Sequence, residues 1–354
     1  MTCAFVKNER YFLTTNIEPK TRRFDMQNNE DLLTESGNKY VLFPIKYPDV
    51  YEMYKKAASA FWLPDEINFQ QDLIDIDKLS NNEKHFIYHV LAFFAASDGI
   101  VMENLATRFS KDIPIPEVKN FYAFQNAMEA VHSETYSLLI DTYVKDTVEK
   151  DKLFNAVTNF PAIKNKADWA IQWIDNDTAP FSQRLVGFAI VEGLFFSASF
   201  CAIFWLRERG LLPGLSFANQ LIARDESMHT DFACLLYSKI NNRLQRETVE
   251  KMIRDAVDIE KEFIIESIPC SMIGMNKELM SDYIKYIGDR LLLLLGYEKI
   301  YNTVNPFQFM EMSASETKAS FFEVKVSSYA KPVSFVGGQS IIPSELSINT
   351  NDDF

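Results

Sequence analysis

The chain has few of the residues that mark secreted, zinc-binding or nucleic-acid-binding proteins. Its 354 residues include only four cysteines, at positions 3, 201, 234 and 270, and none of them forms a Cys-x-x-Cys pair. This spacing predicts neither a disulfide framework nor a zinc knuckle and favours a reducing compartment. Lys and Arg number 36 against 49 Asp and Glu, a net charge of −13. Such an excess of acid argues against a phosphate-binding surface, so no nucleic-acid partner is expected.

Targeting and membrane signals are also missing. The first sixteen residues hold no continuous apolar stretch of the kind found in a signal peptide. The most apolar stretch, 185–206, carries Glu192 near its middle, which favours a buried helix over a membrane span. We therefore expect a cytoplasmic protein with no membrane contact.

Apolar residues with a helical period dominate what is present. The hydrophobic fraction is 47% and the chain holds 29 Phe, enough for a large core. From Tyr47 onward the apolar spacing is helical, and no β-rich region competes. Helices are predicted at 48–60, 82–109, 117–144, 162–174, 180–209, 215–240, 246–267 and 277–295. Ser80 and Glu83 form a capping-box pattern before the second of these. The sequence therefore predicts an all-α bundle.

The two ends of the chain differ from this helical body. Residues 1–40 are polar and show no sustained period, which predicts an N-terminal arm. The helical domain is expected over 41–311. Residues 312–354 hold Gly, Pro and Ser without a helical period, yet keep apolar residues such as Tyr329 and Phe354. Such a flexible tail is compatible with a docking peptide and equally with an ordinary ragged terminus.

One short pattern occurs twice in this helical body. Glu129-x-x-His132 and Glu226-x-x-His229 each lie in a long apolar helical stretch, and together they use two of only four histidines. Residues three apart share one helix face, so each copy offers a carboxylate and an imidazole to the same point. Buried charges of this kind are costly unless they are paired or bind cations. The repeat therefore predicts a metal site.

A lone acid precedes each copy of the pattern. Glu192 lies 34 residues before Glu226, and either Asp98 or Glu103 stands in the corresponding helix before Glu129. We choose Asp98 because it follows the apolar run VLAFFAAS, whereas Glu103 approaches the helix end. Two lone acids and two Glu-x-x-His helices make up the dimetal site of ferritin-like bundles. The predicted ligands are Asp98, Glu129, His132, Glu192, Glu226 and His229. Such an oxygen-rich set suits iron or manganese better than zinc.

Tyr136 shares the ligand face of its helix, one turn beyond His132. A phenol at this position would be close enough to exchange an electron with a metal. Phe196, Phe200 and Ile222 lie on ligand-bearing faces, where they would wall the phenol away from water. Simple core packing explains these three residues equally well.

These residues resemble the small, radical-generating subunit of class I ribonucleotide reductase, of the eukaryotic type. The resemblance covers almost the whole chain. Its most specific segments are FWLPDE, AFFAASDGIVMENL, EAVHSETYSLLID, VEGLFFSASF and ARDESMHTDFA. All six metal-ligand positions and the radical tyrosine position hold the expected residue types.

The resemblance implies a ribonucleoside-diphosphate reductase subunit that serves DNA precursor synthesis. It implies two iron ions per chain, with manganese as the alternative, that react with O₂ and oxidise Tyr136 to a stable radical. It further implies radical transfer through His132 and Asp225 to Trp62 and then Tyr329. The receiving partner would be a large catalytic subunit bound by the C-terminal tail, and the chain would form a homodimer.

The sequence agrees that substrate chemistry must lie elsewhere, since the chain has no closely spaced cysteine pair and no Gly-rich phosphate loop. Two other functions remain open from the residues alone. A ferritin-like oxidase or oxygenase could use the same six ligands on a small substrate, and a helical interaction protein would need no metal. His85 and His89 could also bind a metal, although we favour a packing and hydrogen-bonding role because no third ligand stands nearby.

Overall fold

The computed structural model describes residues 31–34, 40–267, 276–310, 335–336 and 339–340. Tyr329 and the terminal segment from 341 to 354 lie outside the described residues, as does most of the predicted arm. Within the described ranges, the only strands are β1 (Phe335–Val336) and β2 (Gln339–Ser340), which pair antiparallel. The rest of the regular structure is helical, which confirms the all-α prediction.

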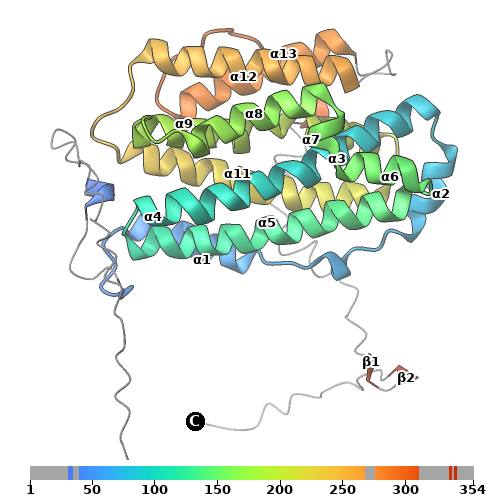
Figure 1. Ribbon diagram of the computed structural model, residues 1–354, viewed down its shortest axis with the longest axis horizontal. Coiled ribbons are helices and arrows are strands. Elements are labelled where there is room, and N and C mark those ends of the chain that lie inside the picture. Colours follow the sequence, from blue (N-terminus) through green and yellow to red (C-terminus); the bar gives the residue numbers. More distant parts are fainter. Residues whose placement is uncertain (1–30, 35–39, 268–275, 311–334, 337–338, 341–354) are drawn as a thin grey trace, which may run out of the picture.

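Long helices form the body of the molecule (Figure 1). They are α1 (Pro48–Ser59), α3 (Asn81–Asn104), α5 (Pro116–Tyr143), α8 (Pro161–Asp175), α9 (Phe181–Ile190), α10 (Ser197–Glu208), α11 (Pro213–Ser238), α12 (Arg246–Ser267) and α13 (Lys277–Leu294). In Figure 1, α12 and α13 lie together along one side of the bundle, and α1 and α5 lie along the other. Helices α3 and α11 are among those that run between them. The core is one continuous cluster of buried apolar side chains.

Short helical elements connect these rods. They are η1 (Asp31–Leu33), η2 (Pro64–Glu66), α2 (Gln70–Lys78), α4 (Ser110–Asp112), α6 (Thr147–Phe154) and α7 (Ala156–Asn159). The hydrophobic period did not predict α2, α6 or α7. None of the three is longer than three turns, so the apolar face of each is too short to show a period.

Two predicted helices contain a π-helical turn. The helix predicted at 82–109 is α3 followed by the π turn η3 (Leu105–Phe109), and the one predicted at 180–209 is α9 and α10 joined by η4 (Val191–Phe195). A π turn inserts one extra residue into a helix and often lies at a functional site. Glu192 lies inside η4.

The start of α3 is fixed locally, as the capping-box pattern predicted. The Ser80 hydroxyl accepts from the Glu83 amide (3.3 Å), and the Ser80 amide donates to the Glu83 carboxylate (2.9 Å). These two bonds satisfy amides that the first turn leaves without helical partners.

The start of α11 is fixed by a distant residue. Asp72 of α2 is fully buried and accepts from the amides of Gly214 (2.8 Å) and Leu215 (2.7 Å). The Tyr143 hydroxyl also donates to this carboxylate (2.5 Å). A Cβ on Gly214 would come within 2.7 Å of the Asn68 carbonyl oxygen, so only glycine allows this approach. The contact sets the position of the helix that carries Glu226 and His229.

Two helical stretches, Asn81–Asp112 and Phe181–Glu208, are long and apolar enough to cross a membrane. Their most apolar windows are 56% and 89% buried inside the protein. Core helices of a large bundle have the same composition, so these two stretches are not evidence for a membrane protein.

Candidate metal centre

The six predicted ligands come together in the middle of the bundle. Asp98 comes from α3, Glu129 and His132 from α5, Glu192 from η4, and Glu226 and His229 from α11. None has more than 3% of its surface exposed. Four separate elements thus direct four carboxylates and two imidazoles to one dry region.

The ligand atoms form two overlapping groups. One group contains Asp98, Glu129 and His132; the other contains Glu129, Glu192, Glu226 and His229; within each group one atom per residue lies within 4.8 Å of the others. Glu129 belongs to both groups. Glu226 also spans them, because its Oε1 lies 3.0 Å from Nδ1 of His132 and its Oε2 lies 3.2 Å from Nδ1 of His229. These groups would suit two metal ions, with Glu129 and Glu226 able to reach both.

Both imidazoles turn the same nitrogen inward. Nδ1 of His229 lies 3.0 Å from Glu129, and Nδ1 of His132 lies 3.5 Å from the other oxygen of the same carboxylate. Among the described residues, several buried atoms at the site make contacts but no hydrogen bond, among them Oδ2 of Asp98, Oε2 of Glu192 and Nδ1 of His132. Buried polar atoms are rarely left in this state, and cations would satisfy them. The donor set therefore fits a pair of metal ions.

The crowding of like charges appears in the pKa values. Burial, followed by the negative charge of neighbouring ligand carboxylates, raises the pKa of Asp98 and Glu192 well above the ordinary value. Burial would lower the pKa of both imidazoles, but the surrounding carboxylates outweigh it and raise the pKa of His132 and His229. So much buried acid is unfavourable without compensating positive charge.

A glycine brings Glu192 to the second position. Gly193 follows Glu192 in η4, and a Cβ there would lie 2.8 Å from Cγ2 of Thr230 on α11. Thr230 directly follows the ligand His229. The absence of a side chain at position 193 therefore lets η4 and α11 approach closely enough for their ligands to meet.

The second ring nitrogen of His132, Nε2, faces away from the ligand carboxylates and toward Asp225. This nitrogen lies 3.2 Å from Oδ2 of Asp225, and the Trp62 indole N–H donates to the same oxygen (2.8 Å). The other oxygen of Asp225 accepts from Nη2 of Arg224 (2.7 Å). Burial raises the pKa of Asp225, but the bond to His132 and the Arg224 charge outweigh it, so the pKa lies below the ordinary value. An ionised Asp225 thus links the imidazole to the indole.

Tyr136 lies beside the Asp98 group in an apolar pocket. Its side chain is 1% exposed and its hydroxyl has no hydrogen-bond partner among the described residues. Burial, and then the negative charge of Asp98, raises its pKa well above the ordinary value. The ring stacks on Phe94, with centroids 4.4 Å apart and planes at 5°. The phenol is therefore protonated and shielded from water.

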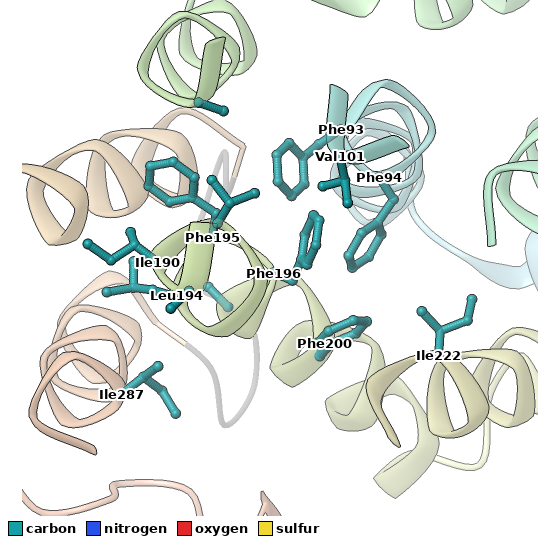
Figure 2. Close-up of a cluster of buried hydrophobic side chains, with 14 of the residues drawn as sticks. Phe93, Phe94, Val101, Ile190, Leu194, Phe195, Phe196, Phe200, Ile222 and Ile287 are labelled. Atoms are coloured by element: carbon teal, nitrogen blue, oxygen red, sulfur yellow. The ribbon is translucent and has the colours of Figure 1, made fainter. Parts of the chain in front are cut away.

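Two of the residues predicted to wall the phenol pack against Phe94, the ring that stacks on Tyr136. Phe196 and Phe200 have ring centroids 5.7 and 5.0 Å from that of Phe94. Figure 2 shows these three rings and Ile222 directed toward a common space. Phe94 itself was not predicted from the sequence, although it lies one turn before Asp98 and so shares the ligand face.

A second residue missed from the sequence is Gln125. Its amide nitrogen donates to Glu192 (3.1 Å) and lies 3.3 Å from Glu129. The position, one helical turn before Glu129, was the available signal.

The two remaining histidines form no metal group among the described residues. Nδ1 of His89 donates to the His85 carbonyl (2.7 Å), and the His89 ring packs against Phe160 with centroids 4.4 Å apart. Packing and hydrogen bonding account for this pair.

Comparison with known proteins decides the family. The family model described as "Ribonucleotide reductase, small chain" matches residues 39–306. The chain belongs to this family. It is therefore a subunit of the oxidoreductase that reduces ribonucleotides, and the family and the site together indicate a dimetal centre.

Relatives within the ribonucleotide reductase family cover most of the chain. The ribonucleoside-diphosphate reductase small subunit of Dictyostelium discoideum is 59% identical over 85% of this chain and 89% of its own length. The small chain of Trypanosoma brucei brucei is 56% identical over 88% and 93%. The solved ribonucleotide reductase Rnr4 homodimer of Saccharomyces cerevisiae is 40% identical, covers 85% of this chain and 92% of its own, and superposes with a TM-score of 0.74.

Proposed function

We propose that the chain generates a stable tyrosyl radical at Tyr136 for a ribonucleoside-diphosphate reductase. The carrying observation is a buried phenol, without a hydrogen-bond partner among the described residues, beside two overlapping groups of carboxylates and imidazoles. When bound, a pair of iron ions supplies the dioxygen-dependent oxidation that removes one electron and one proton from the phenol. Manganese would occupy the same ligands.

Each metal position would draw on four side chains. Asp98 and His132 would hold the first ion, Glu192 and His229 the second, and Glu129 and Glu226 would bridge them. The imidazoles would bind through Nδ1, because this nitrogen faces the carboxylates in both residues. Gln125 would orient Glu129 and Glu192 by hydrogen bonds to both.

The pocket would preserve the radical. Phe94 covers one face of the Tyr136 ring, and Phe196, Phe200 and Ile222 complete an apolar wall. Water and soluble reductants would have no path to the phenoxyl oxygen through these side chains. The radical would therefore persist until the large subunit draws on it.

Radical transfer would begin along the hydrogen-bonded series of His132, Asp225 and Trp62. The indole N–H and the imidazole nitrogen meet on one carboxylate oxygen, so an electron leaving Trp62 can be accompanied by a short proton shift toward Asp225. The Trp62 and His132 rings are also stacked, with centroids 6.0 Å apart. Tyr329 would continue the route to the large subunit, where ribonucleoside diphosphates are reduced.

The proposal also covers the partners of the chain and its location. The tail, 312–354, would dock on the large subunit. Two copies of the chain would form a homodimer, since the solved Rnr4 relative from Saccharomyces cerevisiae is a homodimer. A cytoplasmic location fits the free, buried thiols of Cys201 and Cys234.

Spectroscopy tests the radical. Protein loaded with ferrous ion and exposed to oxygen should give a tyrosyl signal in electron paramagnetic resonance, and Tyr136→Phe should abolish it while two metals still bind. Tyr122→Phe is the matched control, since Tyr122 is equally buried on α5, also lacks a hydroxyl partner among the described residues and lies seven residues before Glu129 rather than seven after it. A full signal in Tyr136→Phe would place the radical elsewhere.

Truncation tests the docking role of the tail. Deleting residues 348–354 should leave the radical intact and eliminate ribonucleotide reduction with the large subunit. Retained activity at equal subunit concentrations would refute the role of these residues in docking.

A further inference from the structure

A buried ion pair lies outside the six-ligand site. Lys166 of α8 is 1% exposed, Glu260 of α12 is fully buried, and Nζ lies 2.6 Å from Oε2. Burial lowers the pKa of Lys166 to about 8 and raises the pKa of Glu260 to about 7, and each partner limits the shift of the other. Burying two charges is expensive, and apolar residues of similar size often replace such a pair without loss. The pair therefore calls for a role beyond stability.

The lysine reaches the π turn that holds Glu192. Its Nζ donates to the backbone carbonyl of Phe195, the last residue of η4, at 2.7 Å. Aromatic rings fix the ammonium from two sides, because Nζ lies 3.3 Å from the centroid of Phe93 and 4.1 Å from that of Phe263. Figure 2 shows Phe93 of α3 directed toward Phe195 and Phe196. Three helices thus hold one backbone atom at the end of the turn.

A π turn has a specific need for such a contact. The extra residue displaces carbonyls from their regular helical partners, so side chains often supply the donor. Here Ser197 Oγ donates to the Leu194 carbonyl (2.7 Å), and Lys166 supplies a stronger, charged donor to the next carbonyl. In the middle of the turn, Gly193 lies against Thr230. Glu192 directly precedes this glycine, within a turn that is held at its centre and at its C-terminal end.

We propose that Lys166 and Glu260 act as a clamp that keeps η4 in its π-helical form and so positions Glu192 for the second metal. Glu260 holds the ammonium in place, and the ammonium holds the Phe195 carbonyl. Without this donor, η4 would relax toward regular α-helical hydrogen bonding, and the Glu192 side chain would turn away from His229. The clamp touches no ligand, so both residues are positioning residues. The inference rests on the proposed function in one respect, that Glu192 is a metal ligand.

The test compares two variants that differ in whether Lys166 is present to donate to the Phe195 carbonyl. Lys166→Met/Glu260→Gln removes the donor to Phe195 and leaves no unpaired buried charge, whereas Glu260→Gln alone keeps the lysine and its bond to the carbonyl. Anaerobic titration with Mn²⁺ or Fe²⁺ measures both dissociation constants, and paramagnetic resonance of Mn²⁺ distinguishes one bound ion from a coupled pair. Urea unfolding of the metal-free proteins establishes that each variant is folded.

The double variant should bind one ion with wild-type affinity and the second about 10- to 100-fold more weakly, the range found when outer partners of metal ligands are lost. Glu260→Gln keeps the donor to Phe195 but loses the charge that holds the ammonium, so it should weaken the second ion by less than the double variant does. Two ions bound with wild-type affinity by the folded double variant would overturn the clamp. Failure of the wild-type protein to bind a pair of ions would instead contradict the proposed function.

A second pair of substitutions covers the case in which the double variant does not fold. Lys166→Gln/Glu260→Gln keeps polar groups in the same space but shortens the donor, so it should also weaken the second metal. Hydrogen exchange then reports on the turn itself. Amides of 194–200 should exchange faster than in Glu260→Gln, and unchanged exchange together with unchanged metal affinity would end the proposal.

Discussion

Asp98 and Glu192 occupy equivalent places in the two halves of the site, each as the lone acid before a Glu-x-x-His helix, yet their surroundings differ. Asp98 lies in the regular helix α3, one turn after Phe94, which stacks on Tyr136. Glu192 lies in a π turn that Lys166 holds from outside. Carboxylates at corresponding positions of the repeated pattern thus lie on one regular and one irregular backbone.

The outer connections of the two histidines differ in the same way. His132 is joined through Asp225 to Trp62, a series that leads from the first metal position toward η2. His229 packs edge-on against Phe121, with ring centroids 6.4 Å apart. The series of His132, Asp225 and Trp62 is the part of the site that would move an electron and a proton. Gln125 and the contacts of η4 would set the geometry of the ligands.

The largest effect should follow from breaking the outward connection of the first half. Asp225→Asn keeps the shape of the side chain but removes the charge that both Trp62 and His132 face. We expect reduction with the large subunit to fall by roughly 100-fold per radical formed, the upper range for lost outer partners of ligands. Radical content by paramagnetic resonance and turnover with saturating large subunit measure the two quantities separately.

A variant of the ligand-setting group provides the control. Gln125→Leu removes hydrogen bonds to Glu129 and Glu192, so metal affinity should fall while turnover per radical stays at the wild-type value. Trp62→Phe, which lacks the indole N–H, should behave like Asp225→Asn. If Gln125→Leu and Asp225→Asn gave the same loss of turnover per radical, the distinction between ligand-setting and transfer residues would be wrong.

A smaller effect should be a difference in the free energy of unfolding when alanine replaces each of the two glycines that follow the lone acids. Gly99 follows Asp98, and a Cβ there would meet nothing within 4 Å, whereas a Cβ on Gly193 would lie 2.8 Å from Thr230. Gly193→Ala should lower the free energy of unfolding by about 1–3 kcal/mol through overpacking. Gly99→Ala should raise it by up to about 1 kcal/mol, because alanine favours the helix.

Urea unfolding of the metal-free proteins measures both changes. Thr230→Ser removes the Cγ2 methyl that meets the new Cβ, so adding it to Gly193→Ala should restore part of the loss. Equal changes for the two glycines would mean that η4 and α11 are not closely packed at this point.

The sequence predicted that these six side chains converge because the Glu-x-x-His pattern is local. Glu129 and His132 share a helix face by spacing alone, and the same holds for Glu226 and His229, so burial and residue type sufficed to place six side chains. Asp225 and Trp62 came from the family resemblance, since they are far apart in the chain. The roles of all these residues remain predictions that the experiments above address.

What the sequence did not reveal depends on distant contacts. Apolar periodicity cannot distinguish an α-helix from one with a single inserted residue, so it predicts a regular helix where the structure has the π turn at Glu192. Lys166 lies 29 residues from Phe195 and 94 from Glu260, and no local rule pairs them. Even Phe94, which shares a face with Asp98, became identifiable as the ring stacked on Tyr136 only when α3 and α5 were placed side by side.

The smallest effect should come from the start of α3, where the first half again relies on local structure. Ser80→Ala removes the hydroxyl that accepts from the Glu83 amide and should lower the free energy of unfolding by about 1 kcal/mol. Because Asp98 lies about five turns further along the helix, metal affinity should not change. Urea unfolding and metal titration of the same preparation measure the two results.

The start of α11 offers the contrast. The carboxylate of Asp72, a residue of α2, accepts from two amides of α11 and also from the Tyr143 hydroxyl. Asp72→Ala should therefore cost more than Ser80→Ala and should also weaken metal binding, because it frees the start of the helix that carries Glu226 and His229. A larger loss of metal affinity in Ser80→Ala than in Asp72→Ala would reverse the assignment of local order to the first half and long-range order to the second.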